Sequence, residues 1–285
     1  MPFEPTTWEL RTRSLTTADH TLVMGILNTT PDSFSDAGRW LDPAAAINRG
    51  RELAAMGADL IDVGGESTRP GAASVDAAEE RARVVPVVKA LVAEGLVVSI
   101  DTSKPSIAGA AIDAGAEIVN DVSGLSDPAM IAMCSDTGVG VVIMHMLGDP
   151  RTMQIDPTYG DVVADVAGFL RHRTEAAVAA GVDPSRIVVD PGIGFGKTIR
   201  HNLSLLNGID RIGEGRPVLV GTSRKAFLGT ILDQAGRPSS PDDRDIATAA
   251  TTALAIASGA AVLRVHDVGG AVDAARTADA IVRSR

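Results

Sequence analysis

The apolar residues of this chain are concentrated in eight short runs rich in Val and Ile, and each run is followed by polar or glycine-rich residues. Segments rich in Ala, Leu and Ile separate the runs, and several of them close on Gly, as helices often do. Nearly continuous apolar runs are typical of strands that are covered on both faces. The predicted strands are Val23–Asn28, Leu60–Glu66, Val97–Thr102, Ile118–Gly124, Val139–His145, Ile187–Gly192, Val218–Arg224 and Val262–Asp267.

Strict alternation of strands and helices predicts a parallel sheet with right-handed crossovers. Eight such units favour the α/β class and a closed (β/α)8 TIM barrel, with a doubly wound open sheet as the alternative. No Pro-, Gly- or Ser-rich linker divides the chain, so we expect a single domain over residues 1–285. Within it, about residues 8–22 have the pattern of a β-hairpin that turns at Thr17–Asp19 and covers the bottom of the barrel, and the barrel spans about residues 23–285.

The polar ends of the eight runs predict an active site. In a barrel these ends meet at the C-terminal face, where barrel enzymes carry out their chemistry. Capping of the following helix is the alternative for Asp and Asn. It does not account for His145, Arg264 and His266, because His and Arg are poor caps and are costly to bury unpaired. The residues at the ends are Asn28, Glu66, Asp101, Asn120, His145, Asp190, Arg224 and His266.

Two segments after the first two strands have the composition of functional loops. NTTPDSFSDAG (Asn28–Gly38) has no apolar periodicity and is too long for a simple connection. Asn28 offers an amide oxygen suited to Mg²⁺, although it could equally cap or turn the chain. GGESTRPG (Gly64–Gly71) contains Arg69, which can bind phosphate in bidentate fashion, but surface turns use the same residue types.

Asp101, Asn120 and Asp190 end three different strands, so we expect them to project into one cavity. Two acids and an amide can accept hydrogen bonds from the donor edge of a flat heterocycle, much as a carboxylate pairs with Arg. A metal-binding pair of carboxylates is the competing interpretation. Zinc is disfavoured because the chain lacks His spacing such as HxxxH.

The last two strands end in basic residues. GTSRKAFLG (Gly221–Gly229) and RVHD (Arg264–Asp267) together supply Arg224, Lys225, Arg264 and His266. Barrel enzymes frequently hold phosphate in this region, so we favour an anion site there. Salt bridges between strand ends are the alternative for Arg224.

Composition narrows the class of partner. The formal net charge is −10 and aromatic residues make up 3%, which argues against binding to nucleic acid or to anionic membranes. No apolar run approaches the roughly 20 residues of a membrane span, and the N-terminal residues do not have the pattern of a signal peptide. Cys134 is the single cysteine, so we expect a reducing, cytoplasmic location.

Eight motifs in order resemble those of the dihydropteroate synthases of folate biosynthesis, from about Met24 to Val268. They are NTTPDSFSD, VGGESTRPG, SIDTSKP, VNDVSGLSDP, MHMLGDPRTMQ, DPGIGFGKT, GTSRKAFLG and LRVHDV. The resemblance implies a transferase that condenses (7,8-dihydropterin-6-yl)methyl diphosphate with 4-aminobenzoate, giving 7,8-dihydropteroate and diphosphate with Mg²⁺ as cofactor. It also implies a sulfonamide target and a homodimer, for which DIATAATTALAIASG could supply the contact face.

The resemblance further implies a role for each matching residue. The pterin would be held by Asp101, Asn120, Met144, Asp190 and Lys225. The diphosphate would be bound by Asn28, Thr68, Arg69, Arg264, His266 and the backbone of Val265, and Asn28 would also contact the metal. The 4-aminobenzoate pocket would be formed by Phe34, Pro70 and Phe195. The catalytic groups would be Asp101, Lys225, Arg264 and His266.

The chain departs from the family pattern at three positions. Thr29 and Ala37 replace a frequent Val and Gly, and Ala226 replaces a Ser whose hydroxyl often lies near the carboxylate of the second substrate. Three other functions are compatible with parts of the pattern. They are a pterin-binding methyltransferase on the same barrel, a Schiff-base aldolase that uses Lys225, and a pterin-binding relative without catalytic activity.

Overall fold

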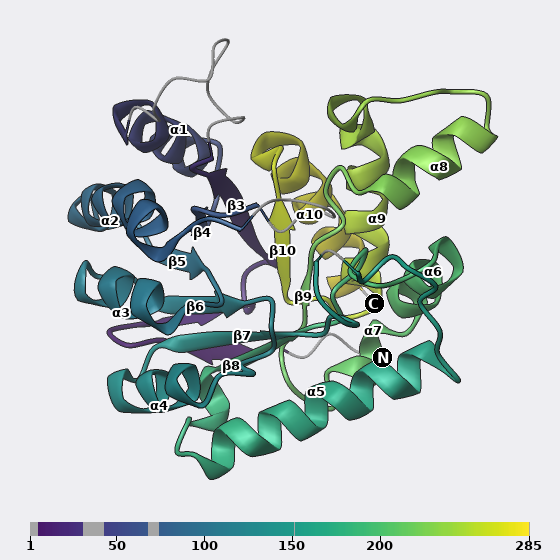
Figure 1. The fold of residues 1–285 in the computed structure, drawn as a ribbon. Coiled ribbons are helices and arrows are strands. Elements are labelled where there is room, and N and C mark those ends of the chain that lie inside the picture. The colour runs from purple at the N-terminus through teal and green to yellow at the C-terminus, as the bar shows by residue number, and fades with distance from the viewer. Residues whose placement is uncertain (1–4, 31–42, 68–73, 151, 285) are drawn as a thin grey trace.

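The computed structural model of the chain describes residues 5–30, 43–67, 74–150 and 152–284. Its main feature is a ring of eight parallel strands surrounded by helices (Figure 1), as predicted. The strands are β3 (Leu22–Asn28), β4 (Leu60–Gly64), β5 (Val98–Asp101), β6 (Ile118–Asp121), β7 (Gly140–Met144), β8 (Ile187–Asp190), β9 (Leu219–Val220) and β10 (Val262–Val265). Each predicted run overlaps one of them, and most of the predicted runs extend beyond the strand at their C-terminal ends.

The strands pair in the order β8-β7-β6-β5-β4-β3-β10-β9, and a parallel bridge between Val189 and Val218 joins the two outer strands. The Val189 N–H donates to the carbonyl of Pro217 at 3.1 Å across this junction. This eight-stranded sheet therefore closes on itself, which excludes the open doubly wound alternative.

Helices connect successive strands and cover the outside of the ring (Figure 1). They are α1 (Pro43–Ala55), α2 (Ala77–Ala93), α3 (Pro105–Asp113), α4 (Pro128–Thr137), α5 (Val162–Ala179), α6 (Ile199–Asn207), α7 (Ile209–Ile212), α8 (Ala226–Gln234), α9 (Asp245–Ala257) and α10 (Val268–Arg283), with 3₁₀ turns η2 (Pro184–Arg186) and η3 (Pro241–Arg244). Several begin at an Asp whose side chain accepts from the first turn, as Asp76 does before α2 and Asp161 before α5.

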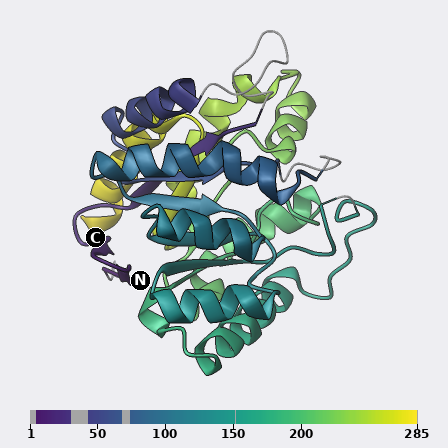
Figure 2. The ribbon, with the colours of Figure 1, turned by 60° about the vertical axis from the view of Figure 1, so that its left-hand side comes forward.

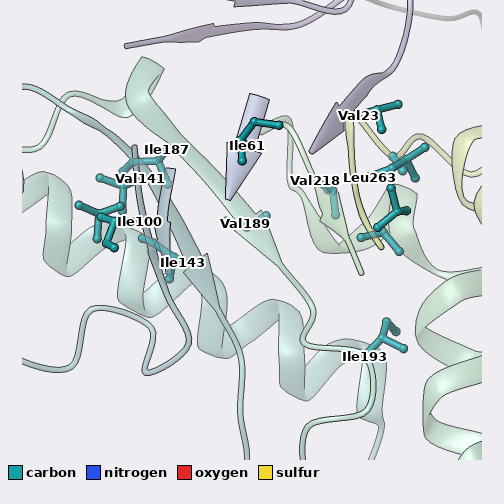
Figure 3. Close-up of a cluster of buried hydrophobic side chains, with 14 of the residues drawn as sticks. Val23, Ile61, Ile100, Val141, Ile143, Ile187, Val189, Ile193, Val218 and Leu263 are labelled. Atoms are coloured by element: carbon teal, nitrogen blue, oxygen red, sulfur yellow. The ribbon is translucent and has the colours of Figure 1, made fainter. Parts of the chain in front are cut away.

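Alternate residues of each strand face opposite sides of the barrel wall. In β8, Ile187 and Val189 belong to the outer core between strands and helices, whereas Val188 packs inside the barrel. Figure 3 shows residues of this outer core, which come from most of the strands. The inner face is apolar only in its lower half; toward the strand ends the same positions carry Asp190 in β8 and Arg264 in β10.

The N-terminal residues form the predicted hairpin, with β1 (Thr7–Glu9) antiparallel to β2 (Ser14–Thr16). The predicted position of its turn, Thr17–Asp19, is wrong: the chain reverses at Leu10–Arg13, where the Leu10 N–H donates to the Arg13 carbonyl at 2.8 Å. Leu10 is buried under the barrel while the residues just after it are exposed, so the polar stretch forms the turn.

The hairpin closes the lower end of the barrel, as predicted (Figure 2, beside the N label). Trp8 and Leu10 are each 2% exposed and pack with the lower inner residues of the strands. The indole N–H of Trp8 donates to the Arg186 carbonyl at 2.8 Å. Its ring lies so close to Gly140 that a Cβ there would come within 3.0 Å of Nε1. The hairpin can pack this closely against β7 because that strand begins with a glycine, Gly140.

Replacing the Trp8 side chain should destabilise the protein. Trp8→Ala leaves a cavity beneath the barrel and should lower the free energy of unfolding by about 3–5 kcal/mol in chemical denaturation. Met56→Ala, at a site that is 44% exposed, is the control and should change it by less than about 0.5 kcal/mol. An equally small loss in both variants would show that Trp8 does not seal the barrel.

Candidate active site

A small cavity of about 50 Å³ lies at the upper end of the barrel, and of the eight residues predicted at the strand ends it brings together Asn120, Asp190 and His266. Glu66 and Asp101 line a second cavity instead. The lining of the small cavity is Ile26, Asn120, Met144, Asp190, Phe195, Gly221, Ser223, Lys225, Arg264 and His266. Four of the five residues predicted to hold a pterin are in this set. The fifth, Asp101, lines a neighbouring cavity of about 480 Å³ and reaches the first group through Arg264.

Arg264 lies between two buried carboxylates. Its Nε donates to Asp62 Oδ2 and its Nη2 to Asp101 Oδ2, each at 2.6 Å. The second oxygen of each carboxylate, Oδ1, is buried and has no hydrogen-bond partner within the described part of the chain. Buried acceptors without partners are rare in proteins, and a ligand is one way to satisfy them.

The environment of Asp101 changes its acidity. Burial raises the pKa of Asp101 to about 7, the positive charge of Arg264 opposes this rise, and the negative charge of Asp62 adds to it. Asp62 has no place in the functional assignment made from sequence. It stands in the middle of a strand, and only its inward register, two residues before the strand end, could have indicated a role.

Asp190 is fixed by the glycine-rich turn that follows it. Its Oδ1 accepts from the Gly192 N–H at 2.7 Å, and burial raises its pKa against the opposing charge of Lys225. Gly192 has φ 63°, and a Cβ there would lie 1.8 Å from the His145 carbonyl oxygen. Only glycine fits, so the turn that orients Asp190 depends on this residue.

Lys225 reaches across the cavity toward the same turn. Its Nζ donates to the Ile193 carbonyl and lies 4.4 Å from the centre of the Phe195 ring. Burial lowers the pKa of Lys225 to about 8, although the charge of Asp190 opposes the decrease. Lys225, which is predicted to hold the pterin, is therefore in direct contact with Phe195, which is predicted to form part of the aminobenzoate pocket.

His266 is oriented by Ser223, which the sequence analysis did not single out. The backbone N–H of His266 donates to Ser223 Oγ at 3.1 Å, and Oγ lies 2.9 Å from Nδ1 of the ring. With the hydroxyl proton directed to Nδ1, the neutral ring carries its own proton on Nε2. His266 is then a hydrogen-bond donor at the rim of the cavity.

Arg224 does not join this group. Its guanidinium pairs with both oxygens of Asp245 at 2.9 Å and with Asp242 at 2.5 Å. The preference for Arg224 as part of an anion site is therefore not supported, since acids of η3 and α9 already hold its charge. Its φ of 59° turns the chain sharply after Ser223 and leads into Lys225.

The other predicted residues have varied positions. Asn28 ends β3, is partly exposed and pairs with Gly64 of β4. The side chain of Val265 packs in the outer core, so only its backbone could contact a ligand. Phe34, Thr68, Arg69 and Pro70 lie outside the described residues.

A buried Lys–His pair supports the rim of the cavity. Lys197 Nζ lies 2.9 Å from His145 Nδ1 and donates to the Phe195 carbonyl at 2.9 Å. Burial lowers the pKa of His145 to about 3 and that of Lys197 to about 7. His145 is therefore neutral and accepts from Lys197. This explains the conspicuous His145 at a strand end: it anchors the turn that carries Phe195.

Helix capping does not account for the polar strand ends around the cavity. Asp267 does cap α10, accepting from the Gly270 N–H at 3.3 Å, but Asp101 and Asp190 instead bind Arg264 and the glycine turn. Across the described residues, no three His, Cys, Asp or Glu side chains are placed to chelate a metal ion. Nor does any helix in those segments have the length and apolarity needed to cross a bilayer.

Comparisons with known proteins agree with this geometry. The sequence pattern of the family described as pterin binding enzyme matches residues 24–266. Dihydropteroate synthase of Mycobacterium leprae is 50% identical over 265 residues, which cover 90% of this chain and 92% of the relative. That of Escherichia coli K12 is 41% identical over 268 residues, which cover 93% of each chain.

Solved structures give the same result. Xanthomonas albilineans dihydropteroate synthase with 4-aminobenzoic acid has a TM-score of 0.89 and 45% identity, covering 98% of each chain. The Burkholderia cenocepacia enzyme complexed with 7,8-dihydropteroate has a TM-score of 0.88 and 43% identity, covering 99% of each chain. Family pattern, relatives and solved structures lead to one conclusion: this chain belongs to the pterin-binding enzymes, as a member of the dihydropteroate synthases.

Proposed function

We propose that this chain condenses (7,8-dihydropterin-6-yl)methyl diphosphate with 4-aminobenzoate to give 7,8-dihydropteroate and diphosphate. The observation that carries the proposal is a set of buried acceptors at the upper end of the barrel: Asn120 and Asp190 line the small cavity, and Asp101, on the strand beside Asn120, is joined to it through Arg264. Such a set is complementary to the donor edge of a flat heterocycle. The product and second substrate are those bound by the solved relatives.

The reaction breaks the bond between the pterin methylene carbon and the diphosphate oxygen, and it forms a bond from that carbon to the aniline nitrogen. Loss of the leaving group first places a delocalised positive charge on the pterin. The buried carboxylates of Asp101 and Asp190 stabilise this charge, whereas Arg264 and His266 stabilise the charge on the departing diphosphate. The aniline nitrogen attacks as the neutral amine and then releases one proton to solvent, so no covalent enzyme intermediate is needed.

The second substrate would enter beside Phe195. The ring of Phe195 packs against Lys225 Nζ, and its backbone is held by Lys197. An aminobenzoate at this point would lie beside the small cavity, which Phe195 lines together with the residues proposed to hold the pterin. Phe34 and Pro70 remain part of this proposal on the strength of the family pattern, as do Thr68 and Arg69 for the diphosphate.

A magnesium ion fits this site as a partner of the diphosphate. Mg²⁺ keeps several waters and is commonly bound through one or two protein oxygens together with substrate phosphates. Asn28, partly exposed at the end of β3, provides one neutral amide oxygen. When bound, the ion would reduce the negative charge of the leaving group.

The location and assembly of the protein are also proposals. The single cysteine, Cys134, is buried and unpaired with any other, as suits a reducing cytoplasm. A homodimer is supported by large apolar residues exposed on the last two long helices. Ile246 and Leu254 of α9 are 80% and 67% exposed, and Ile281 of α10 is 56% exposed.

A methyltransferase on the same barrel is disfavoured by the rim of the cavity. Such an enzyme has no leaving diphosphate, whereas here Ser223 directs His266 and two acids direct Arg264. An assay of diphosphate release, with both substrates and Mg²⁺, separates these functions. Release that requires 4-aminobenzoate supports the synthase. Pterin binding without any release would establish an inactive pterin-binding protein instead.

Asp190→Asn should weaken pterin binding strongly while the fold is preserved. The amide keeps the shape of the side chain but loses the charge that pairs with the pterin, which should lower affinity by about ten- to a hundredfold. Calorimetric titration with a pterin measures the loss, and an unchanged melting temperature shows that the protein is folded. Unchanged affinity in a folded variant would remove Asp190 from the site.

The pH dependence should reveal the titration of Asp101. Because its pKa is raised to about 7, kcat/KM for the pterin diphosphate should rise with pH through about 7, as the accepting carboxylate forms. Stability should change in the opposite direction. The folded state binds this proton more tightly than the unfolded chain, so between about pH 4 and 7 this group favours folding as the pH falls.

Acid unfolding through Asp101 is therefore not the cause of the expected loss of activity below about pH 7. Asp101→Asn should have lower activity and a flatter acid limb. If kcat/KM of this variant still fell at acid pH as in the wild type, the assignment of that decrease to Asp101 would be contradicted.

A further inference from the structure

Asp62 is a fully buried carboxylate inside the barrel, and the proposed reaction assigns it no contact with substrate. Its Oδ2 accepts from Asn120 Nδ2 at 2.9 Å and from Arg264 Nε at 2.6 Å. It therefore contacts one residue of the proposed pterin site and one of the proposed diphosphate site. In β4 it stands two residues after Leu60, so both side chains point to the inner face of the barrel.

The contact with Asp62 determines which way the Asn120 amide faces. A carboxylate only accepts hydrogen bonds, so the amide must direct its NH₂ group to Asp62. The carbonyl oxygen, Oδ1, then faces away from Asp62, and Asn120 lines the small cavity. Within the described residues no hydrogen bond from the protein reaches this oxygen. The cavity thus receives an acceptor rather than a donor.

Without Asp62 the two ends of the amide would be nearly equivalent in shape. Rotation by half a turn would present the NH₂ group to the cavity and would oppose the donor edge of the ligand. A wrongly directed polar group in a buried site leaves two donors facing each other, and such mismatches are strongly unfavourable. The orientation of one amide could therefore decide whether the heterocycle is accepted.

The burial of Asp62 itself suggests a role beyond packing. Its Oδ1 is buried without a hydrogen-bond partner among the described residues. A buried carboxylate held this way is costly, and apolar residues of similar volume often stabilise a core as well or better. If this inner position served packing alone, Leu or Val would suit it better, since such residues occupy the layer below.

We propose that Asp62 is a positioning residue that fixes the Asn120 amide with its carbonyl oxygen toward the pterin, so that the cavity presents acceptors to the ligand. The inference rests on the proposed function, and it assigns the selection of the heterocycle to a side chain that does not contact it. Through Arg264 Nε, the same carboxylate also holds the guanidinium that faces the leaving group.

The first test measures pterin binding directly, by calorimetric titration with a dihydropterin in the absence of 4-aminobenzoate. Asp62→Ala should weaken binding by about tenfold or more, because the amide is no longer held. Asp279→Ala is the matched control. Asp279 is also a buried carboxylate; it accepts from the Thr21 N–H and Oγ1 at 2.7 Å and lies on α10 beside the start of β3. This control should lose stability but keep its affinity for the pterin.

The second test exchanges the two side chains. Asn120→Asp alone places two carboxylates at a contact of 2.9 Å and should abolish most pterin binding near neutral pH. Adding Asp62→Asn restores a donor facing an acceptor, and the second oxygen of the new Asp faces the cavity. The charge of the pair is unchanged, so the double variant should recover at least about tenfold in affinity over Asn120→Asp.

These outcomes decide the proposal. Recovery in the exchanged pair, which is close in shape to the original, requires a direct interaction between positions 62 and 120. Additive losses in the double variant, or wild-type affinity in Asp62→Ala, would overturn the proposal. A wild-type protein that binds pterin but releases no diphosphate would refute the proposed function alone, since both binding tests could still be read.

Discussion

A closed ring of parallel strands leaves each strand side chain only two directions, into the barrel or outward beneath the helices. The closure through Val189 and Val218 imposes this choice on all eight strands. Because the alternation has a period of two, β10 places Leu263 and Val265 in the outer core and Arg264 inside. Parallel strands also bring all their carboxyl ends to the same rim. The position of the active site follows from these two facts.

The same constraint separates stability from chemistry along the barrel axis. The lower interior is mainly apolar and is sealed by Trp8. The upper interior holds acids and bases that neutralise one another, with Arg264 paired to Asp62 and Asp101. Burial moves the pKa of Asp101 up to about 7 and that of Lys225 down to about 8, as in many enzyme sites. A rigid wall keeps them in place before any substrate arrives.

Much of this arrangement could be predicted from the chain itself. The eight Val/Ile runs identified the strands because a doubly covered strand must be apolar over its whole length. Asn120, Asp190 and Arg264 could be assigned to one site because each stands at or next to a strand end, where the fold gathers polar groups. The place of Lys225 beside them was given by the resemblance to the family, since this residue lies in the turn between β9 and α8. The hairpin was recognised as well, but its turn was misplaced, since the polar stretches at 11–14 and 17–20 both have turn composition.

What the sequence determined by itself was the order of strands and helices and a part of the set of residues at the rim, because these depend on local patterns of a few residues. Pairing between distant residues was decided only by the tertiary structure. Asp62 meets Arg264 from 202 positions away, and Arg224 is taken out of the anion site by Asp245, the first residue of α9. No local pattern encodes such contacts, because the barrel wall and the low dielectric inside it, rather than chain proximity, determine which charges must pair.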